Sequence, residues 1–220
     1  KPVDQLVSEL WGADSALRAE ARSALAAHGT KAVAPMVRAV RNDKTRRTVV
    51  SILREMGAVK VVPELIGLLS DEEAQIKAGS LMFSVIGAES VAQAKTLLEC
   101  VRSKPAVDNY CGTSLVKVMS KNPGAHLGML RKALGDKNTL ARVYAAASLS
   151  HAGAKAAPAV PELTKALADS DSTVRWNAAE ALGNVGAAAK PAAPALKKAL
   201  EDSSAEVRRR AEEALKAING

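Results

Sequence analysis

Aromatic residues are scarce in this chain of 220 residues, which contains one Phe, two Tyr and two Trp. The apolar material is therefore Ala, Leu, Val, Ile and Met. Ala and Leu are strong helix formers, whereas β-branched and aromatic residues dominate strands. The composition favours closely packed helices over a sheet, and it supplies few of the aromatics on which single-stranded nucleic acid stacks.

Long apolar runs are missing as well. No segment reaches the roughly 18 uninterrupted apolar residues of a membrane span, which predicts a soluble protein without a transmembrane segment. The first residue is Lys, so a signal peptide removed before Lys1 would leave no trace. A cytoplasmic location is favoured, and a secreted or periplasmic one stays open.

Motifs of catalysis and metal binding are also absent. The sequence contains no glycine-rich phosphate loop, nucleophile elbow or paired-carboxylate constellation. His28, His126 and His151 stand in different parts of the chain, without Cys, Asp or Glu at a recurrent ligand spacing. We therefore predict a protein that is not an enzyme and that holds no metal and no cofactor.

Internal repetition is the strongest feature that is present. Blocks of the form Ala-Leu-x-Asp begin at Ala133, Ala166 and Ala199, at intervals of 33 residues. A looser repeat reaches the N-terminus through equivalent core positions, which are Leu25, Leu53, Phe83, Leu115, Leu149, Leu182 and Leu215. Seven copies then fill the chain as one domain, with approximate limits 1–30, 31–60, 61–90, 91–124, 125–157, 158–190 and 191–220.

Each copy has the pattern of a helical hairpin. In the copy at 158–190, residues 158–168 and 173–185 each predict a helix, and Asp-Ser-Asp-Ser between them predicts a turn. Glycines are expected to end the second helices, at Gly29, Gly57, Gly87, Gly153 and Gly186. One hairpin cannot bury its apolar stripe alone, so neighbouring copies must stack.

This pattern resembles a known repeat family. Pro161, Asp169, Val174-Arg175 and Ala181-Leu182 are similar to the short HEAT-like repeat of the phycobilisome-lyase type. The resemblance covers the whole chain and is most specific in residues 125–219. It implies an all-α fold, a right-handed α-α superhelix (solenoid) of about seven HEAT-like hairpins, whose second helices line a concave face.

The resemblance also implies a structural role for acidic and basic residues six positions apart. In such arrays an Asp in the turn and an Arg early in the second helix form a ladder between repeats, because a guanidinium fork suits a carboxylate or helix-terminal carbonyl groups. The expected ladder residues are Asp136, Arg142, Asp169, Arg175, Asp202 and Arg208, with Asp71 and Lys77 as a weaker copy. A row of ligand-binding arginines is the alternative.

A partner-binding strip is expected on the concave face, opposite the apolar stripe of the second helices. Its predicted residues are Arg47, Arg54, Lys77, Leu81, Val143, Trp176 and Arg209. Trp176 is either a binding anchor or a ring packed on the long side chains of its neighbours. Trp11 is expected to cover the open N-terminal end of the stack.

Charge is distributed unevenly along the chain, whose net charge is +8. Residues 31–60 hold eight basic and two acidic side chains, whereas residues 61–90 hold one basic and five acidic ones. This basic patch is either a solvated face or a contact for an acidic protein. Nucleic acid is disfavoured as a partner.

The two cysteines fall at small interior positions of one hairpin. The repeat alignment places Cys100 at the Ala166 position and Cys111 at the Ala178 position. Two reduced, buried cysteines are the favoured interpretation. A disulfide across the hairpin is the alternative, and it would indicate an oxidising compartment.

These features predict a non-catalytic scaffold or adaptor that binds another protein on its concave face. The resemblance leaves two alternatives. One is a subunit or chaperone of a bilin (phycobiliprotein) lyase, and the other is a nucleic-acid-binding HEAT-like protein. The sequence does not predict the oligomeric state.

Overall fold

The computed structural model describes residues 1–86, 91–104 and 108–219, which are largely helical and contain no strand. The elements in chain order are α1 (Val3–Glu9), α2 (Ser15–His28), η1 (Gly29–Ala32), α3 (Val33–Arg38), α4 (Asp43–Met56), α5 (Ala58–Leu68), α6 (Gln75–Val85), α7 (Val91–Ser103), α8 (Asp108–Lys121), α9 (Pro123–Ala133), α10 (Thr139–Ala152), η3 (Gly153–Ala159), α11 (Val160–Ala166), α12 (Ser172–Val185), η4 (Gly186–Ala192), α13 (Ala193–Ala199) and α14 (Ala205–Asn219).

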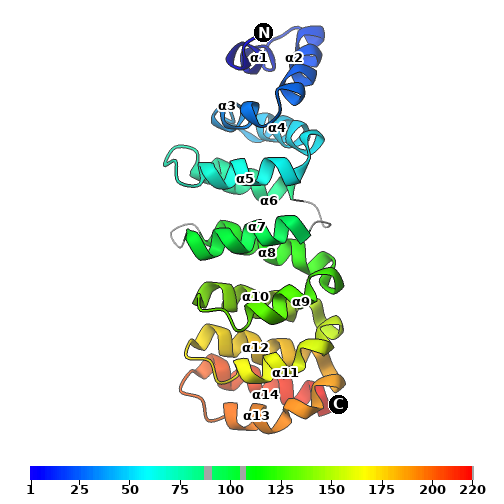
Figure 1. Ribbon diagram of the computed structural model, residues 1–220, viewed down its shortest axis with the longest axis vertical. Coiled ribbons are helices and arrows are strands. Elements are labelled where there is room, and N and C mark those ends of the chain that lie inside the picture. The colour runs from blue at the N-terminus through cyan, green and yellow to red at the C-terminus, as the bar shows by residue number, and fades with distance from the viewer. Residues whose placement is uncertain (87–90, 105–107, 220) are drawn as a thin grey trace.

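Consecutive helices pack as hairpins, from α1 with α2 to α13 with α14. Each second helix also contacts the second helix of the next hairpin, and the first helices with their 3₁₀ segments do the same in the other layer. Figure 1 shows the hairpins stacked in chain order in one elongated column, with the termini at opposite ends. The chain is an all-helical repeat solenoid. The repeat limits given above stay a prediction.

Glycines end the second helices where the sequence predicts it. Positive φ angles between 56 and 90° occur at Gly29, Gly57, Gly153 and Gly186, a backbone region that only glycine adopts without strain. Gly87 lies outside the described residues. Side-chain oxygens cap the first turn of four second helices, and they belong to Asp14, Asn42, Asn138 and Asp171.

The first helix of a C-terminal repeat starts later than the sequence predicts. Residues 158–168 were expected to form one helix, but η3 runs to Ala159 and α11 begins at Val160. Pro158 and Pro161 have no N–H to donate, so a regular helix cannot extend back through both of them. Pro161 lies in the first turn of α11, where a missing donor costs nothing.

The third repeat is shifted by one residue relative to the predicted alignment. Phe83 was assigned to the core, but its side chain is 45% exposed, and Met82 is buried in its place. The reason is a shorter turn before α6: the buried residues on either side of it, Leu69 and Ala74, are five positions apart, whereas the equivalent Leu167 and Val174 are seven positions apart. Because each core position of α6 therefore falls one residue earlier than predicted, Leu81 lies in the core and not in the predicted strip, and it is fully buried.

Cys100 and Cys111 form a disulfide that joins α7 to α8. Both are buried, as their alignment with small core positions predicts. The favoured interpretation of two reduced cysteines is therefore wrong. Their Cα atoms lie 6.0 Å apart across the hairpin, a separation that a disulfide spans.

Arginine forks join successive C-terminal repeats. Arg142 donates from Nε and Nη2 to the Asp169 carboxylate at 2.7 and 2.9 Å, and Arg175 makes the same fork to Asp202 at 2.7 and 2.8 Å. Nη1 of each Arg donates to the main-chain carbonyl of the Asp in its own turn, Asp136 or Asp169, at 3.0 or 2.9 Å. Each guanidinium therefore closes its own turn and binds the next one.

The two ends of this ladder are built differently. Arg208, in the last hairpin, donates to the carbonyl oxygen of Asp202 at 2.7 Å. Asp136 accepts a hydrogen bond of 3.0 Å from Nε of Arg102, at the end of α7. The sequence pattern did not point to Arg102, because this arginine is on a first helix.

Replacing Asp169 by Ala tests whether the ladder holds the stack together. The change removes the acceptor of the Arg142 fork and leaves a guanidinium that is only 13% exposed without its partner. We expect the free energy of unfolding to fall by about 1–3 kcal/mol, measured by urea denaturation. Lys155→Ala, at an exposed position away from the ladder, is the control. Equal stability of the two variants would contradict a structural role.

His126 makes stability depend on pH. Its side chain is 1% exposed, and neither ring nitrogen has a hydrogen-bond partner among the described residues. Burial lowers the pKa of His126. The unfolded chain therefore binds the proton more readily than the folded chain, so protonation of His126 favours unfolding. The stability that depends on neutral His126 is complete above about pH 6.5 and is lost as the pH falls below it.

We expect His126→Leu to reduce this pH dependence. Urea midpoints at neutral pH and below pH 6 should differ less in the variant than in the parent chain, because a leucine has no proton to bind. The two exposed histidines, His28 and His151, serve as controls through substitution by Gln. An unchanged pH dependence in His126→Leu would refute the assignment.

Candidate functional site

The second helices present a continuous surface along the stack, which we call the second-helix face. Helical spacing places three residues of each helix at equivalent positions on it. From α4 to α14 these are Arg47, Ser51 and Arg54; Ile76, Ser80 and Phe83; Asn109, Thr113 and Val116; Val143, Ala147 and Ser150; Trp176, Glu180 and Gly183; and Arg209, Glu213 and Lys216.

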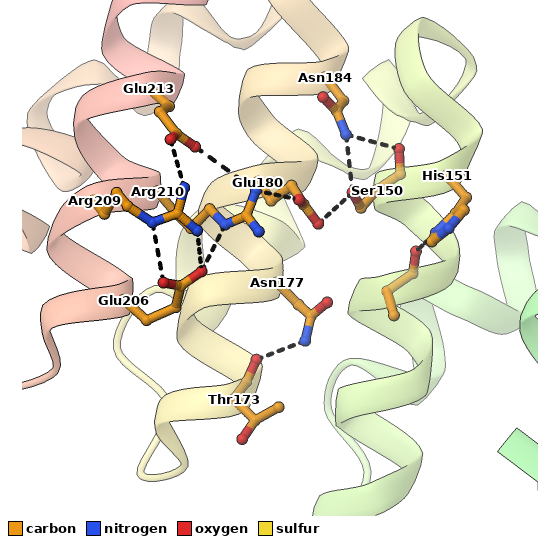
Figure 2. Close-up of polar contacts among 11 residues, drawn as sticks. Ser150, His151, Thr173, Asn177, Glu180, Asn184, Glu206, Arg209, Arg210 and Glu213 are labelled. Atoms are coloured by element: carbon orange, nitrogen blue, oxygen red, sulfur yellow. Dashed lines mark hydrogen bonds and ion pairs between the residues drawn. The ribbon is translucent and has the colours of Figure 1, made fainter. Parts of the chain in front are cut away.

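In the C-terminal half of this face, polar groups bind one another (Figure 2). Arg210 of α14 forms ion pairs with Glu180 of α12 and with Glu206 of its own helix. Glu180 also accepts a hydrogen bond of 3.0 Å from Ser150 of α10, and Asn184 donates to the same hydroxyl at 2.9 Å. The network links three second helices and neutralises much of their charge.

Three predicted strip residues lie in this half, and each has contacts within the chain. Trp176 is partly buried against the core, and the Arg210 guanidinium lies 5.6 Å from the centre of its ring. Arg209 forms ion pairs with Glu206 and, at 2.6 Å, with Glu213. Val143 is partly buried against the core. Trp176 thus shows the contacts of the packing alternative.

In the N-terminal half, cations of the face lack acidic partners. Arg47 is exposed and forms no ion pair with any described residue. Arg54 donates to the carbonyl oxygen of Ser84 at 2.7 Å, and it too has no acidic partner in the described part of the chain. The two arginines line one hollow of about 280 Å³ together with Ser51 and Ser84. Predicted strip residues are therefore brought together here.

Lys77 and Leu81 do not join them. Lys77 donates from Nζ to the carbonyl oxygen of Arg38 at 3.0 Å, and Arg38 itself binds Asp71 at 2.8 Å. Lys77 thus contacts the end of α3 in the preceding repeat. It lies at the inter-helix turns, as its second assignment, to a weaker copy of the ladder, predicts. Leu81 is in the core, so its assignment to the strip is wrong.

Two apolar side chains of α6 lie on the face instead: Ile76 at the position expected of Lys77, and Phe83 at the position equivalent to Gly183. Ile76 is 73% exposed and Phe83 is 45% exposed. Both line a hollow of about 600 Å³ between α4, α6 and α8, which also contains Arg46 and Tyr110. Ile76 and Phe83 were not predicted, because the repeat alignment placed each core position of α6 one residue too late. Asp71 was the available indication, because aligning it with Asp171 as the capping residue of the second helix gives the observed register.

Two glycines of the second helices allow a tyrosine ring of the following second helix to pack directly against the helix backbone. A Cβ atom on Gly79 would lie 2.2 Å from Cδ1 of Tyr110, and one on Gly112 would lie 2.0 Å from Cζ of Tyr144. Both distances are shorter than any van der Waals contact. The same glycine–tyrosine contact therefore occurs between α6 and α8 and again between α8 and α10.

Trp11 lies at the first turn of the stack, partly buried against the core. It lines a hollow of about 730 Å³ with Arg18, Asn42 and Lys44. No group of three or more His, Cys, Asp or Glu among the described residues could hold a metal ion. Within the same residues, no helix is long and apolar enough to cross a membrane.

Comparisons with known proteins agree with this architecture. Solved structures with the same fold include an engineered protein with 22% identity and a TM-score of 0.54, where the alignment covers 99% of this chain and 96% of that one. The archaeal HEAT-like repeats protein from Thermococcus onnurineus NA1 is 13% identical, with a TM-score of 0.53 and coverage of 100% and 97%. A designed armadillo repeat protein in complex with the peptide (KR)4 is 20% identical, with a TM-score of 0.50 and full coverage of both chains.

These neighbours define the class as an α solenoid of stacked helical repeats. Residues 127–216 match the family model for HEAT repeats. Residues 127–216 are therefore HEAT-like repeats, within a chain whose fold is that of an α solenoid. None of the curated proteins matches it.

Substituting Gly112 by Ala tests the glycine–tyrosine contact. Alanine is the better helix former by about 1 kcal/mol, but its methyl group would overlap the Tyr144 ring. We expect a net loss of about 1–2 kcal/mol in unfolding free energy, measured by urea denaturation. Gly128→Ala in α9 is the matched control, because nothing lies within 4 Å of its added Cβ. It should stabilise the protein, and equal effects at both glycines would contradict the contact.

Proposed function

We propose that this chain is a non-catalytic scaffold that binds an acidic segment of a partner protein across α4, α6 and α8. One observation carries the proposal. Arg47 and Arg54, which have no acidic partner among the described residues, lie on the same face as the exposed Phe83 and Ile76. A partner that carries both carboxylates and apolar side chains would complement this surface.

The energetics of the surface support this partner. Ile76 and Phe83 expose apolar area to water, and burying such a side chain fully contributes about 1.5–3 kcal/mol. Unpaired cations around them attract an acidic chain from a distance, which raises the association rate. Neither effect requires a reactive group. The surface therefore fits binding better than catalysis.

The contrast between the two halves of the face supports the location. At α12 and α14 the arginines are engaged by Glu180, Glu206 and Glu213 (Figure 2). A partner binding there would have to displace these ion pairs. At α4 it would contact Arg47 and Arg54, which have no acidic partner in the described chain that the partner would have to displace. The proposed site is thus narrower than the strip predicted from the sequence.

The designed armadillo repeat protein supports the mode of binding. It has the same fold and holds the peptide (KR)4, so a solenoid of this class accepts a peptide. That peptide is basic, whereas the proposed surface here is basic itself. Charge complementarity therefore indicates an acidic peptide for this chain. The lyase alternative receives no support from the structures described above.

Fluorescence anisotropy with labelled peptides tests the proposal. The probes are a pool of dodecapeptides built from Asp, Glu, Leu and Phe, and a second pool in which Lys replaces Asp and Glu. We expect the acidic pool to bind and the basic pool not to bind. The double substitution Arg47→Glu and Arg54→Glu should weaken acidic-pool binding at least tenfold, because it replaces attraction by repulsion.

Lys155→Glu with Lys190→Glu is the matched control, since both lysines are exposed on the 3₁₀ segments and the change in net charge is identical. If both double variants lose the same affinity, only net charge matters and the proposed site is wrong. If a single-stranded oligonucleotide binds through Arg47 and Arg54 while no peptide does, the face binds nucleic acid and the proposed protein partner is wrong.

A further inference from the structure

A second basic hollow adjoins the proposed peptide site. It is a groove of about 530 Å³ where the ends of α4, α6 and α8 meet the start of α5. Its lining contains four cations, which are Arg54, Lys60, Lys117 and Lys121. No acidic side chain is among the described residues that line it. We call it the cationic groove.

The cations of this groove are close enough to influence one another. Lys117 is partly buried, its Nζ donates to the carbonyl oxygen of Phe83, and it lies 4.1 Å from the centre of the Phe83 ring. Burial lowers the pKa of Lys117, and the charges of Lys121 and Arg54 lower it further. Like charges held together in this way repel one another, and an anion between them would relieve the repulsion.

The rest of the groove lining is apolar or uncharged, which suits an anionic group carried on a peptide. Val59, which is 54% exposed, Met56 and Val85 supply an apolar surface beside the cations. Gly57 precedes α5 and offers no side chain to cap its first N–H groups. The groove shares Arg54 with the hollow beside Arg47. A segment bound along the second-helix face would therefore pass its entrance.

We propose that the cationic groove binds a phosphorylated Ser or Thr side chain of the partner segment. This inference rests on the proposed function and names the modification that the site recognises. One carboxylate carries a single negative charge, whereas a phosphate monoester carries about −1.5 to −2 and offers three acceptor oxygens. A phosphate therefore matches four cations that have no acidic partner among the described residues, one of them an arginine, better than a single acidic residue does.

Three peptide pools test the inference by fluorescence anisotropy. Each is an acidic dodecapeptide pool of Asp, Glu, Leu and Phe with one fixed central residue, which is phosphoserine, glutamate or serine. We expect the phosphoserine pool to bind at least tenfold more tightly than the serine pool, and more tightly than the glutamate pool. In Lys117→Met with Lys121→Gln the ratio of phosphoserine-pool affinity to serine-pool affinity should fall to about twofold or less.

Methionine at position 117 keeps an unbranched apolar stem over Phe83, and circular dichroism checks that the variant folds. Lys121→Gln alone, at an exposed position, should reduce the phosphate advantage by a smaller factor. Lys155→Gln with Lys190→Gln is the control for net charge and should change nothing.

The possible results separate this inference from the proposed function. If the glutamate pool binds as tightly as the phosphoserine pool, or if the advantage survives in the groove variants, the phosphate site is refuted. Serine-pool binding that is lost in the Arg47→Glu and Arg54→Glu variant would still support the scaffold. If no pool binds, both proposals fail.

Discussion

The apolar stripe of a helical hairpin can be covered only by another hairpin, and the whole molecule follows from this constraint. Each second helix packs on the next, so small residues are needed wherever two helices approach closely. Gly183 shows this need, since a Cβ there would lie 3.0 Å from the Cα of Ala214. Alanine fills most other positions of the same kind in the C-terminal repeats, which explains how a core forms almost without aromatic residues.

Stacking also decides which charges are paired within the chain. In the C-terminal repeats the copies are nearly identical, so an Arg of one repeat meets the Asp of the next in the same geometry, as Arg142 and Arg175 do. The second-helix face of these repeats is neutralised as well, through Arg210 and its glutamates. The N-terminal repeats differ in turn length and composition, and there Arg47, Arg54 and the lysines of the cationic groove have no acidic partner in the described chain.

This division separates two tasks along one array. Repeats with regular spacing have their polar groups satisfied internally and supply stiffness, because a satisfied network of ion pairs resists separation of the hairpins. Repeats with irregular spacing leave apolar and basic groups facing water, and these are the groups that a partner can complement. The proposed peptide site and the cationic groove lie together in the second part, and both depend on the position of Arg54.

Much of the fold was determined by the sequence alone. The 33-residue spacing, the glycines that end the second helices and the Ala- and Leu-rich stripes predict helical hairpins that must stack, because these are local properties of helices and turns. Arg47 and Arg54 were also placed on the second-helix face, since their repeat keeps the regular register.

Tertiary structure decided what local patterns do not encode. The turn before α6 is shorter than in the C-terminal repeats, which rotated α6, buried Leu81 and exposed Phe83 and Ile76. Arg102 became the partner of Asp136 from a first helix, and Arg210 covered the ring of Trp176. The four cations of the cationic groove come from the consecutive helices α4 and α5 and from α8, which belongs to a later repeat. Such contacts depend on the rotation and spacing of whole helices in the stack, and only the folded chain sets these.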